Sequence, residues 1–143
     1  MCSSDLLAPE NHQAYSSMLY YAKLRYRLMP YIYSLAGAVY HQGYTIMRGL
    51  AMDFPEDKDI RNIPDQYMFG PSLMVCPVCK YKARQREVCF PDMIEWYDLY
   101  SGTHFSGGQT LNAPAPYNRM PLFVPEGSII PVGPETEDRT SVV

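Results

Sequence analysis

The sequence predicts an α+β fold in which a helical segment and one buried strand precede an antiparallel β-sandwich. Between residues 15 and 40, apolar residues recur at intervals of three and four, as in a helix packed along one side. A short, mostly apolar run follows at residues 45–52. Beyond Gly70, short apolar runs alternate with turn residues about every eight to twelve positions, which is the spacing of short antiparallel strands.

The helix predicted for residues 15–40 contains a proline near its middle. Pro30 lacks a backbone donor and clashes with the preceding turn, so we expect a kink or two abutting helices there. Gly43 follows the last apolar position and supplies a helix stop. The predicted apolar stripe consists of Tyr15, Met18, Leu19, Ala22, Tyr26, Met29, Ile32, Leu35, Ala36 and Val39.

The run at residues 45–52 is typical of a strand that is covered on both faces. Arg48 lies within it and requires either a charged partner or a polar opening. Asp53 ends the run, and residues 57–66 are polar enough for a loop or a short helix. Arg48 and Asp53 are therefore the first candidate site residues.

The remainder of the chain predicts six short strands separated by glycine and proline turns. The chain then divides into a leader or cloning remnant without fixed structure (1–10), a helix-and-strand part (11–70), a β-sandwich (71–134) and a flexible tail (135–143). The predicted strands are residues 73–78, 86–90, 95–100, 109–113, 120–124 and 128–131.

The composition disfavours two classes of partner. The 143 residues include 12 Lys and Arg against 15 Asp and Glu, a formal net charge of -3, so we expect neither nucleic acid nor an acidic membrane as a partner. No apolar run reaches the roughly 20 residues that span a bilayer. Residues 1–10 lack the basic start and apolar stretch of a secretory signal, so the sequence assigns no compartment.

Cys76 and Cys79 have the spacing of a thiol or metal motif, because two thiols three positions apart can share a disulfide or bind one ion. The pair closes an apolar run instead of opening a helix, and only Cys89 and His104 remain as further ligands. Cys2 lies in the leader, which argues against a disulfide framework. We predict no metal and no cofactor, with a CxxC thiol or metal protein as the less favoured alternative.

Several carboxylates lie close together and could imitate an acid/base pair. Their ordinary interpretation is a solvated loop. Asp53 is the strongest of them, because it ends an apolar run that contains Arg48. The pairs are Asp53 with Asp57, Asp57 with Asp59, and Glu135 with Asp138.

Aromatic residues at 96–105 offer rings that could stack on sugars. Alternation along a strand puts Trp96 and Tyr100 on one face and Tyr97 on the other, so core packing is the favoured interpretation. Phe105 completes this aromatic set. The alternative is a free-standing carbohydrate-binding β-module that uses Trp96 and Tyr97.

A series of segments, in their order along the chain, resembles glycoside hydrolase family 31 and covers residues 15–134. In that family such segments form the end of a (β/α)8 barrel followed by a C-terminal β-sandwich, so the resemblance assigns residues 11–70 to the barrel. KYKARQREV at 80–88 and the Gly-Gly-Gln segment look most like the α-xylosidase branch. The segments are 24–35 (LRYRLMPYIYSL), 45–55 (TIMRGLAMDFP), 65–71 (DQYMFGP), 75–78 (VCPV), 96–102 (WYDLYSG), 107–109 (GGQ) and 120–131 (MPLFVPEGSIIP).

The resemblance implies a retaining α-glycosidase, α-xylosidase-like or α-glucosidase-like, that releases terminal α-linked xylose or glucose from oligosaccharides. The family's two catalytic aspartates lie in Trp-x-Asp-x-x-Glu-type and His-Trp-x-Gly-Asp-type segments, and neither pattern occurs here. We therefore expect a chain that is inactive alone and supports the enzyme structurally. An intact enzyme of the bacterial type would be periplasmic or cytoplasmic.

The same resemblance implies the partners of this chain. They are the missing N-terminal barrel portion of the same protein and, in the intact enzyme, an oligosaccharide. A barrel strand without its neighbours predicts exposed apolar surface in the N-terminal half. Barrel active sites lie at the C-terminal ends of the strands, so Arg48 and Asp53 are the candidate substrate-binding residues.

Overall fold

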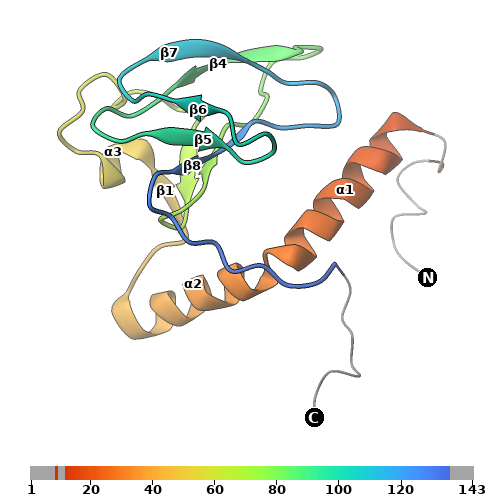
Figure 1. The fold of residues 1–143 in the computed structure, drawn as a ribbon, viewed down its shortest axis with the longest axis horizontal. Coiled ribbons are helices and arrows are strands. Elements are labelled where there is room, and N and C mark those ends of the chain that lie inside the picture. The colour runs from red at the N-terminus through yellow and green to blue at the C-terminus, as the bar shows by residue number, and fades with distance from the viewer. Residues whose placement is uncertain (1–8, 10–11, 136–143) are drawn as a thin grey trace.

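The computed structural model describes Pro9 and residues 12–135. It shows a β region joined to a helical arm, which consists of the two helices between Gln13 and Gln42 (Figure 1). Most of the predicted leader and of the predicted tail therefore lies outside the described residues. Among those described, no helix is both long and apolar enough to cross a bilayer. The elements are α1 (Gln13–Arg27), α2 (Met29–Gln42), β1 (Met47–Gly49), α3 (Leu50–Asp53), β2 (Tyr67–Phe69), β3 (Met74–Val75), β4 (Gln85–Cys89), β5 (Trp96–Asp98), β6 (His104–Phe105), β7 (Thr110–Pro114) and β8 (Leu122–Pro125).

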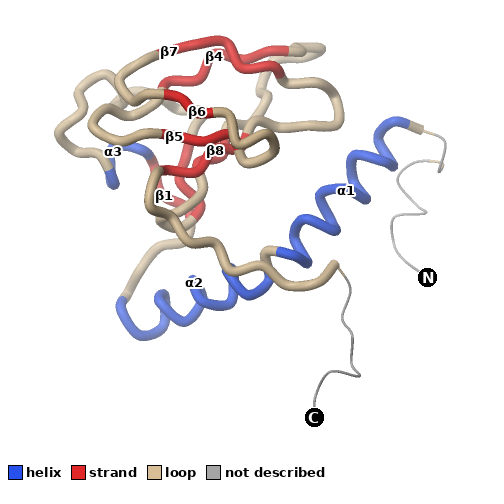
Figure 2. The backbone as a smooth tube through the Cα atoms, viewed as in Figure 1, coloured by secondary structure: helices blue, strands red, loops and turns tan. Residues whose placement is uncertain are grey.

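Two antiparallel sheets form the β region. The larger has the strand order β1-β2-β3-β8-β5-β6, and β4 pairs with β7 in a two-stranded ribbon. Figure 2 shows this ribbon on one side of the larger sheet and the helices α1 and α2 on the other. The prediction of an antiparallel β-sandwich is therefore confirmed, and the larger sheet is the middle layer.

The two faces of the larger sheet contribute to two separate apolar clusters. Met74 and Phe123 point toward the ribbon, whereas their chain neighbours Val75 and Leu122 point toward the helices. This alternation is the period of two that a strand imposes on its side chains. The buried members of the ribbon-side cluster are Leu50, Ile60, Met68, Met74, Cys76, Val88, Phe90, Trp96, Ala113 and Phe123.

The predicted helix is present as two abutting helices, as expected from Pro30. Leu28 separates α1 from α2, and Pro30 lies in the first turn of α2, where a missing backbone donor is tolerated. Gly43 ends α2 in the left-handed conformation, with φ of 65°. The helix, its break and its stop are therefore confirmed.

The face of the arm that packs on the sheet overlaps the predicted apolar stripe only at Ile32 and Leu35. Leu28, Tyr31 and Leu35 are buried and recur at intervals of three and four, whereas α1 itself contains no buried residue. The arm thus has two apolar faces, and the described residues cover only one of them. The large apolar residues of the predicted stripe that lie between 38% and 43% exposed are Met18, Leu19, Tyr26, Met29 and Val39.

Tyr31 fixes α2 to the turn between β2 and β3. Its hydroxyl donates to the Phe69 carbonyl at 2.8 Å and accepts from the Ser72 amide at 3.1 Å. Burial raises the pKa of Tyr31, which keeps this hydroxyl protonated and able to donate. Gly70 lies in this turn with φ of 65°, and a Cβ there would overlap the Tyr31 hydroxyl and come within 2.7 Å of Leu35. Only glycine permits this approach.

The strand predicted for residues 45–52 is wrong in length and in pairing. β1 spans only Met47–Gly49, lies at the edge of the larger sheet and pairs antiparallel with β2. The chain then forms the helical turn α3, which carries Leu50 into the core at 1% exposure. The described residues contain no parallel strand, so the barrel part of the predicted fold is not seen.

The strand predicted for residues 128–131 is absent. This segment has left the sheet: Ile130 packs on the helix-side cluster, and the Gly133 amide donates to the Arg27 carbonyl at 2.8 Å. The contact with Arg27 ties the C-terminal segment to the break between α1 and α2.

The sequence does not predict the strands β2 and β6, because runs of three and two residues are too short to show a periodicity.

We predict that Gly70→Ala lowers the free energy of unfolding by about 3 kcal/mol or more, since a left-handed alanine is strained and its Cβ overlaps Tyr31 and Leu35. Gly43→Ala is the matched control, because Gly43 has the same φ of 65° but nothing within 4 Å of the added Cβ. It should cost about 1 kcal/mol. Urea unfolding of the two variants measures the difference, and equal losses would contradict the close contact at Gly70.

Candidate functional site

The structure brings the two candidate residues Arg48 and Asp53 together. Arg48 Nε donates to Asp53 Oδ1 at 2.7 Å, and Arg48 Nη1 donates to Thr45 Oγ1 at 3.1 Å. The guanidinium carbon lies 5.3 Å from the centre of the Tyr44 ring. The side chains of Arg48 and Asp53 are 20% and 25% exposed. The charged partner that the sequence required for Arg48 is thus Asp53, five positions along the chain, reached through the turn α3.

Burial and the nearby carboxylate shape the electrostatics of this corner. Burial, reinforced by the negative charge of Asp53, raises the pKa of Tyr44, while Arg48 opposes the rise. Asp53 Oδ2 is buried and has no hydrogen-bond partner among the described residues. The corner is therefore a partly buried ion pair in which Asp53 Oδ2 has no donor within the described part of the chain.

Asp53 also lines an open depression of about 530 Å³ formed by residues 53–59 and 92–94. Asp57 lies in its wall and connects two loops, because Oδ1 accepts from the Asp59 amide at 3.0 Å and Oδ2 from the Asp92 amide at 3.0 Å. Both oxygens of Asp57 are engaged by backbone amides. Asp57 therefore braces these loops through backbone amides, and Asp138 of the third carboxylate pair lies outside the described residues.

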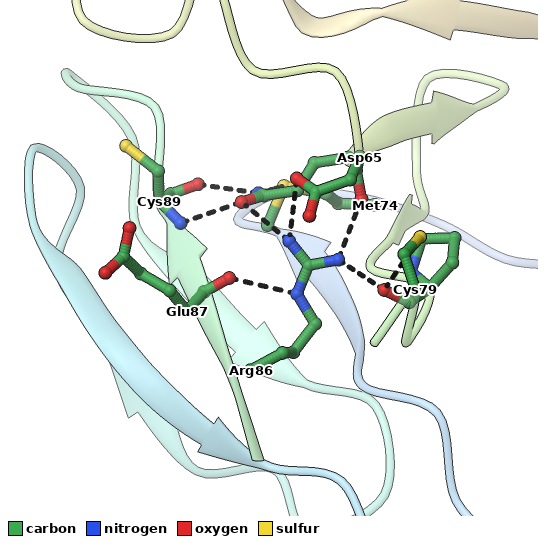
Figure 3. Close-up of polar contacts among 8 residues, drawn as sticks. Asp65, Met74, Cys79, Arg86, Glu87 and Cys89 are labelled. Atoms are coloured by element: carbon green, nitrogen blue, oxygen red, sulfur yellow. Dashed lines mark hydrogen bonds and ion pairs between the residues drawn. The ribbon is translucent and has the colours of Figure 1, made fainter. Parts of the chain in front are cut away.

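A second polar cluster surrounds Arg86, which the sequence placed at the start of a strand and within the 80–88 segment but did not indicate as a site residue (Figure 3). The Arg86 side chain is 8% exposed and pairs with Asp65 Oδ1 at 3.1 Å. Nη1 donates to the Asp65 carbonyl at 2.8 Å and to the Pro77 carbonyl at 2.5 Å, and Nε donates to the Glu87 carbonyl at 2.9 Å. All three guanidinium nitrogens are therefore occupied by contacts within the chain.

Gln66 completes this cluster. Its Oε1 accepts from the Cys89 amide and its Nε2 donates to the Cys89 carbonyl, both at 2.9 Å, so the side chain pairs with the backbone of β4 as a neighbouring strand would. Arg86 Nη2 approaches the same Oε1 at 3.4 Å. The cluster thus joins the loop before β2 to β4 and to the turn after β3, and it acts as an internal brace.

The sequence did carry a signal for the burial of Arg86. Val88 and Phe90 follow it at intervals of two, and both are fully buried. Alternation along a strand therefore places Arg86 on the inward face. A buried arginine requires an acceptor for each donor, and these acceptors lie in distant parts of the chain.

The cysteines do not form a thiol or metal site in the described chain. Cys76, Cys79 and Cys89 are free, and Cys2 lies outside the described residues. Cys76 is buried, and this burial raises the pKa of its thiol to about 12, which leaves almost no reactive thiolate near neutral pH. The described residues hold no group of three His, Cys, Asp or Glu side chains suited to a metal ion. The buried, protonated thiol of Cys76 therefore argues against the alternative of a CxxC thiol or metal protein.

The aromatic residues at 96–105 belong mainly to the core. Trp96 is 0% exposed, and its ring lies 6.1 Å from Phe90 and 5.9 Å from Phe54 between ring centres. Its Nε1 donates to the Pro91 carbonyl at 3.2 Å. Tyr97 is 36% exposed. A sugar cannot stack on a fully buried indole, so core packing is the correct interpretation of Trp96.

The fold defines a β-sandwich domain that carries a helical arm. The sequence profile of the glycosyl hydrolase family 31 C-terminal domain matches residues 43–130. The chain therefore belongs to glycoside hydrolase family 31, and the matched part is the C-terminal domain of such hydrolases. The predicted family resemblance is confirmed.

Known relatives agree with this assignment. The chain is 42% identical to an α-xylosidase of Saccharolobus solfataricus over 115 residues, which are 80% of this chain and 16% of that protein. The crystal structure of an α-xylosidase from Xanthomonas citri is similar over 94% of this chain and 15% of that one, with 48% identity and a TM-score of 0.89.

A dextranase of Flavobacterium johnsoniae, crystallised as a variant complexed with isomaltotriose, is similar over 84% of this chain and 15% of that one, with 36% identity and a TM-score of 0.77. The chain thus spans about one-sixth of the length of the relatives that it matches.

We predict that Arg86→Met lowers the free energy of unfolding by about 3 kcal/mol, because it removes the ion pair with Asp65 and takes the guanidinium donor away from the Asp65 and Pro77 carbonyls. Arg84→Met removes the same charge from an exposed position two residues earlier and should change stability by about 0.5 kcal/mol or less. Urea unfolding compares the two variants. A loss at Arg86 as small as that at Arg84 would show that the brace does not stabilise the fold.

Proposed function

We propose that this chain is the C-terminal part of a retaining α-glycosidase that releases terminal α-linked xylose from oligosaccharides. The similarity to α-xylosidases over most of the chain is the observation that supports this substrate class. In a retaining mechanism one carboxylate attacks the anomeric carbon, and a second protonates the leaving oxygen and then activates water. We assign both carboxylates to the part of the protein that precedes this chain.

The role of the chain itself is to brace the catalytic barrel. The second apolar face of the arm supports this proposal, because exposed apolar surface of this size on a helix calls for a covering partner. In our proposal this partner is the preceding barrel portion of the same protein. The arm (α1 and α2) then belongs with the barrel, and the β-sandwich begins at β1, since β1 already pairs within the larger sheet.

Arg48 and Asp53 are proposed to shape one wall of the substrate cleft. The pair fixes the turn α3, beside the open depression that Asp53 lines. One Asp53 oxygen is held by Arg48, and the other is buried without a partner, so the pair is suited to positioning the wall rather than to donating or accepting a proton. A donor from the barrel portion would satisfy Asp53 Oδ2 in the intact enzyme.

An α-glucosidase or related activity on glucose is the second candidate. The similarity to a dextranase complexed with isomaltotriose supports it, because that relative shares this domain while its bound sugar is built from glucose. A comparison of α-xyloside and α-glucoside hydrolysis by the full-length protein separates the two. A preference for α-glucosides would favour the second candidate.

We predict that the 143-residue chain alone hydrolyses neither α-xylosides nor α-glucosides, and that it binds a hydrophobic dye or self-associates through the uncovered face of α1. Met18→Gln combined with Leu19→Gln should reduce the dye fluorescence, because both are exposed apolar residues of α1. Tyr81→Gln is the control, as Tyr81 is 91% exposed but lies in the β region. A monomeric chain that binds no dye would contradict the covering role of the barrel.

We predict that Asp53→Asn in the full-length enzyme lowers kcat/KM by about tenfold, because the turn α3 loses its ion pair beside the cleft. Glu126→Gln serves as the control, since Glu126 is exposed, makes no ion pair among the described residues and lies outside the depression. Steady-state kinetics on an α-xyloside measure the effect. Unchanged kcat/KM in both Asp53→Ala and Arg48→Ala would remove the pair from the cleft.

A further inference from the structure

A basic groove of about 280 Å³ lies where the turn after β3 meets the loop after β7. It is distinct from the depression beside Asp53, and no residue lines both. None of the residues that line the groove is acidic. Its charged and aromatic lining consists of Lys80, Lys82, Arg84, Arg119, Tyr21 and Tyr117.

The four cations of this groove have no carboxylate partners in the described chain. The ion pairs of residues 12–135 involve Lys23, Arg48, Arg86 and His104, and none of the four groove cations. The whole chain has a formal net charge of -3, so the positive charge of the groove is a local feature. Like charges that gather without counter-charges raise the local concentration of an anionic ligand.

Two arginines of the groove are held against tyrosine rings. The Arg84 guanidinium carbon lies 5.5 Å from the centre of the Tyr117 ring, and that of Arg119 lies 4.6 Å from the centre of the Tyr100 ring. Such stacking orients the planar guanidinium and leaves its edge free to donate. Arg84 uses Nη1 for the Ala83 carbonyl at 2.8 Å. The other donors of the two side chains make no hydrogen bond among the described residues.

Hydrogen bonds to the backbone hold the walls of the groove together. The Ala115 amide donates to the Arg84 carbonyl at 2.8 Å, and Ala115 is 1% exposed. The Met120 amide donates to the Tyr21 hydroxyl, which brings α1 against the end of this loop. The Tyr100 hydroxyl donates to the Met120 carbonyl at 2.8 Å. Arg84 and Arg119 therefore extend from backbone segments that are hydrogen-bonded to neighbouring residues.

We infer that this groove binds an acidic oligosaccharide, with uronate carboxylates paired to Arg84 and Arg119. A guanidinium edge matches a carboxylate in a bidentate fashion, and tyrosine rings suit the apolar faces of sugars. A nucleic acid is disfavoured, because a long polyanion would extend beyond the groove over a chain whose formal net charge is -3, whereas a short acidic oligosaccharide would not. The choice of a carbohydrate rests on the proposed function, whereas the anion site rests on the groove alone.

Calorimetric titration of the 143-residue chain with tetragalacturonate tests the inference, with cellotetraose as the neutral ligand of equal length. Tetragalacturonate should bind and cellotetraose should not, and raising the salt from about 0.05 to about 0.5 M should weaken the binding. Arg84→Gln combined with Arg119→Gln should weaken it by at least about tenfold. Replacing both arginines by lysine keeps the charge but removes the planar guanidinium that can bind a carboxylate in a bidentate fashion, and should weaken tetragalacturonate binding by about threefold.

The matched control is Arg25→Gln combined with Arg27→Gln, which removes the same charge from exposed positions outside both the groove and the depression beside Asp53 and should leave binding unchanged. Equal binding of cellotetraose, full affinity in the double glutamine variant, or tighter binding of a single-stranded oligonucleotide would overturn the inference. So would the absence of tetragalacturonate binding. Hydrolysis of α-xylosides by the full-length enzyme is measured separately, so loss of this site and loss of the proposed function are distinguishable.

Discussion

The arrangement of helices and sheets depends on the contact between Tyr31 and the turn at Gly70. The Tyr31 hydroxyl donates to the Phe69 carbonyl and accepts from the Ser72 amide. Two backbone groups of a buried turn thereby have hydrogen-bond partners, which such groups require. The ring reaches them only because Gly70 has no side chain and adopts a left-handed conformation. This contact fixes α2 on the larger sheet, and α2 in turn fixes the direction of the whole arm.

Two neighbouring arginines show how position decides the role of a charged side chain. Arg86 lies on the inward face of β4, where its guanidinium is occupied by acceptors from three separate segments and stabilises the fold. Arg84 precedes the same strand and is exposed, stacked on Tyr117 with most of its donors free. The first arginine is a brace and the second offers a binding edge, although both have the same chemistry.

The helical arm explains why a domain of this size carries so much exposed apolar surface. One face of the arm packs on the sheet through Leu28, Tyr31 and Leu35, whereas large apolar residues elsewhere on the arm stay 38% to 43% exposed among the described residues. A chain that spans about one-sixth of its relatives is expected to present such a face to the remainder of the protein. The arm is thus a connecting element between two parts of a larger enzyme.

Local patterns in the sequence determined the helices, the break at Pro30, the stop at Gly43 and the antiparallel sandwich, because each depends on neighbours within a few positions. The order of its motifs also determined the family. The tertiary structure alone decided which face of the arm is buried, where the strand at β1 gives way to α3, and which acceptors surround Arg86. Those outcomes depend on contacts between segments far apart in the chain, and a periodicity of 2.0 or about 3.6 residues specifies a face without naming its partner.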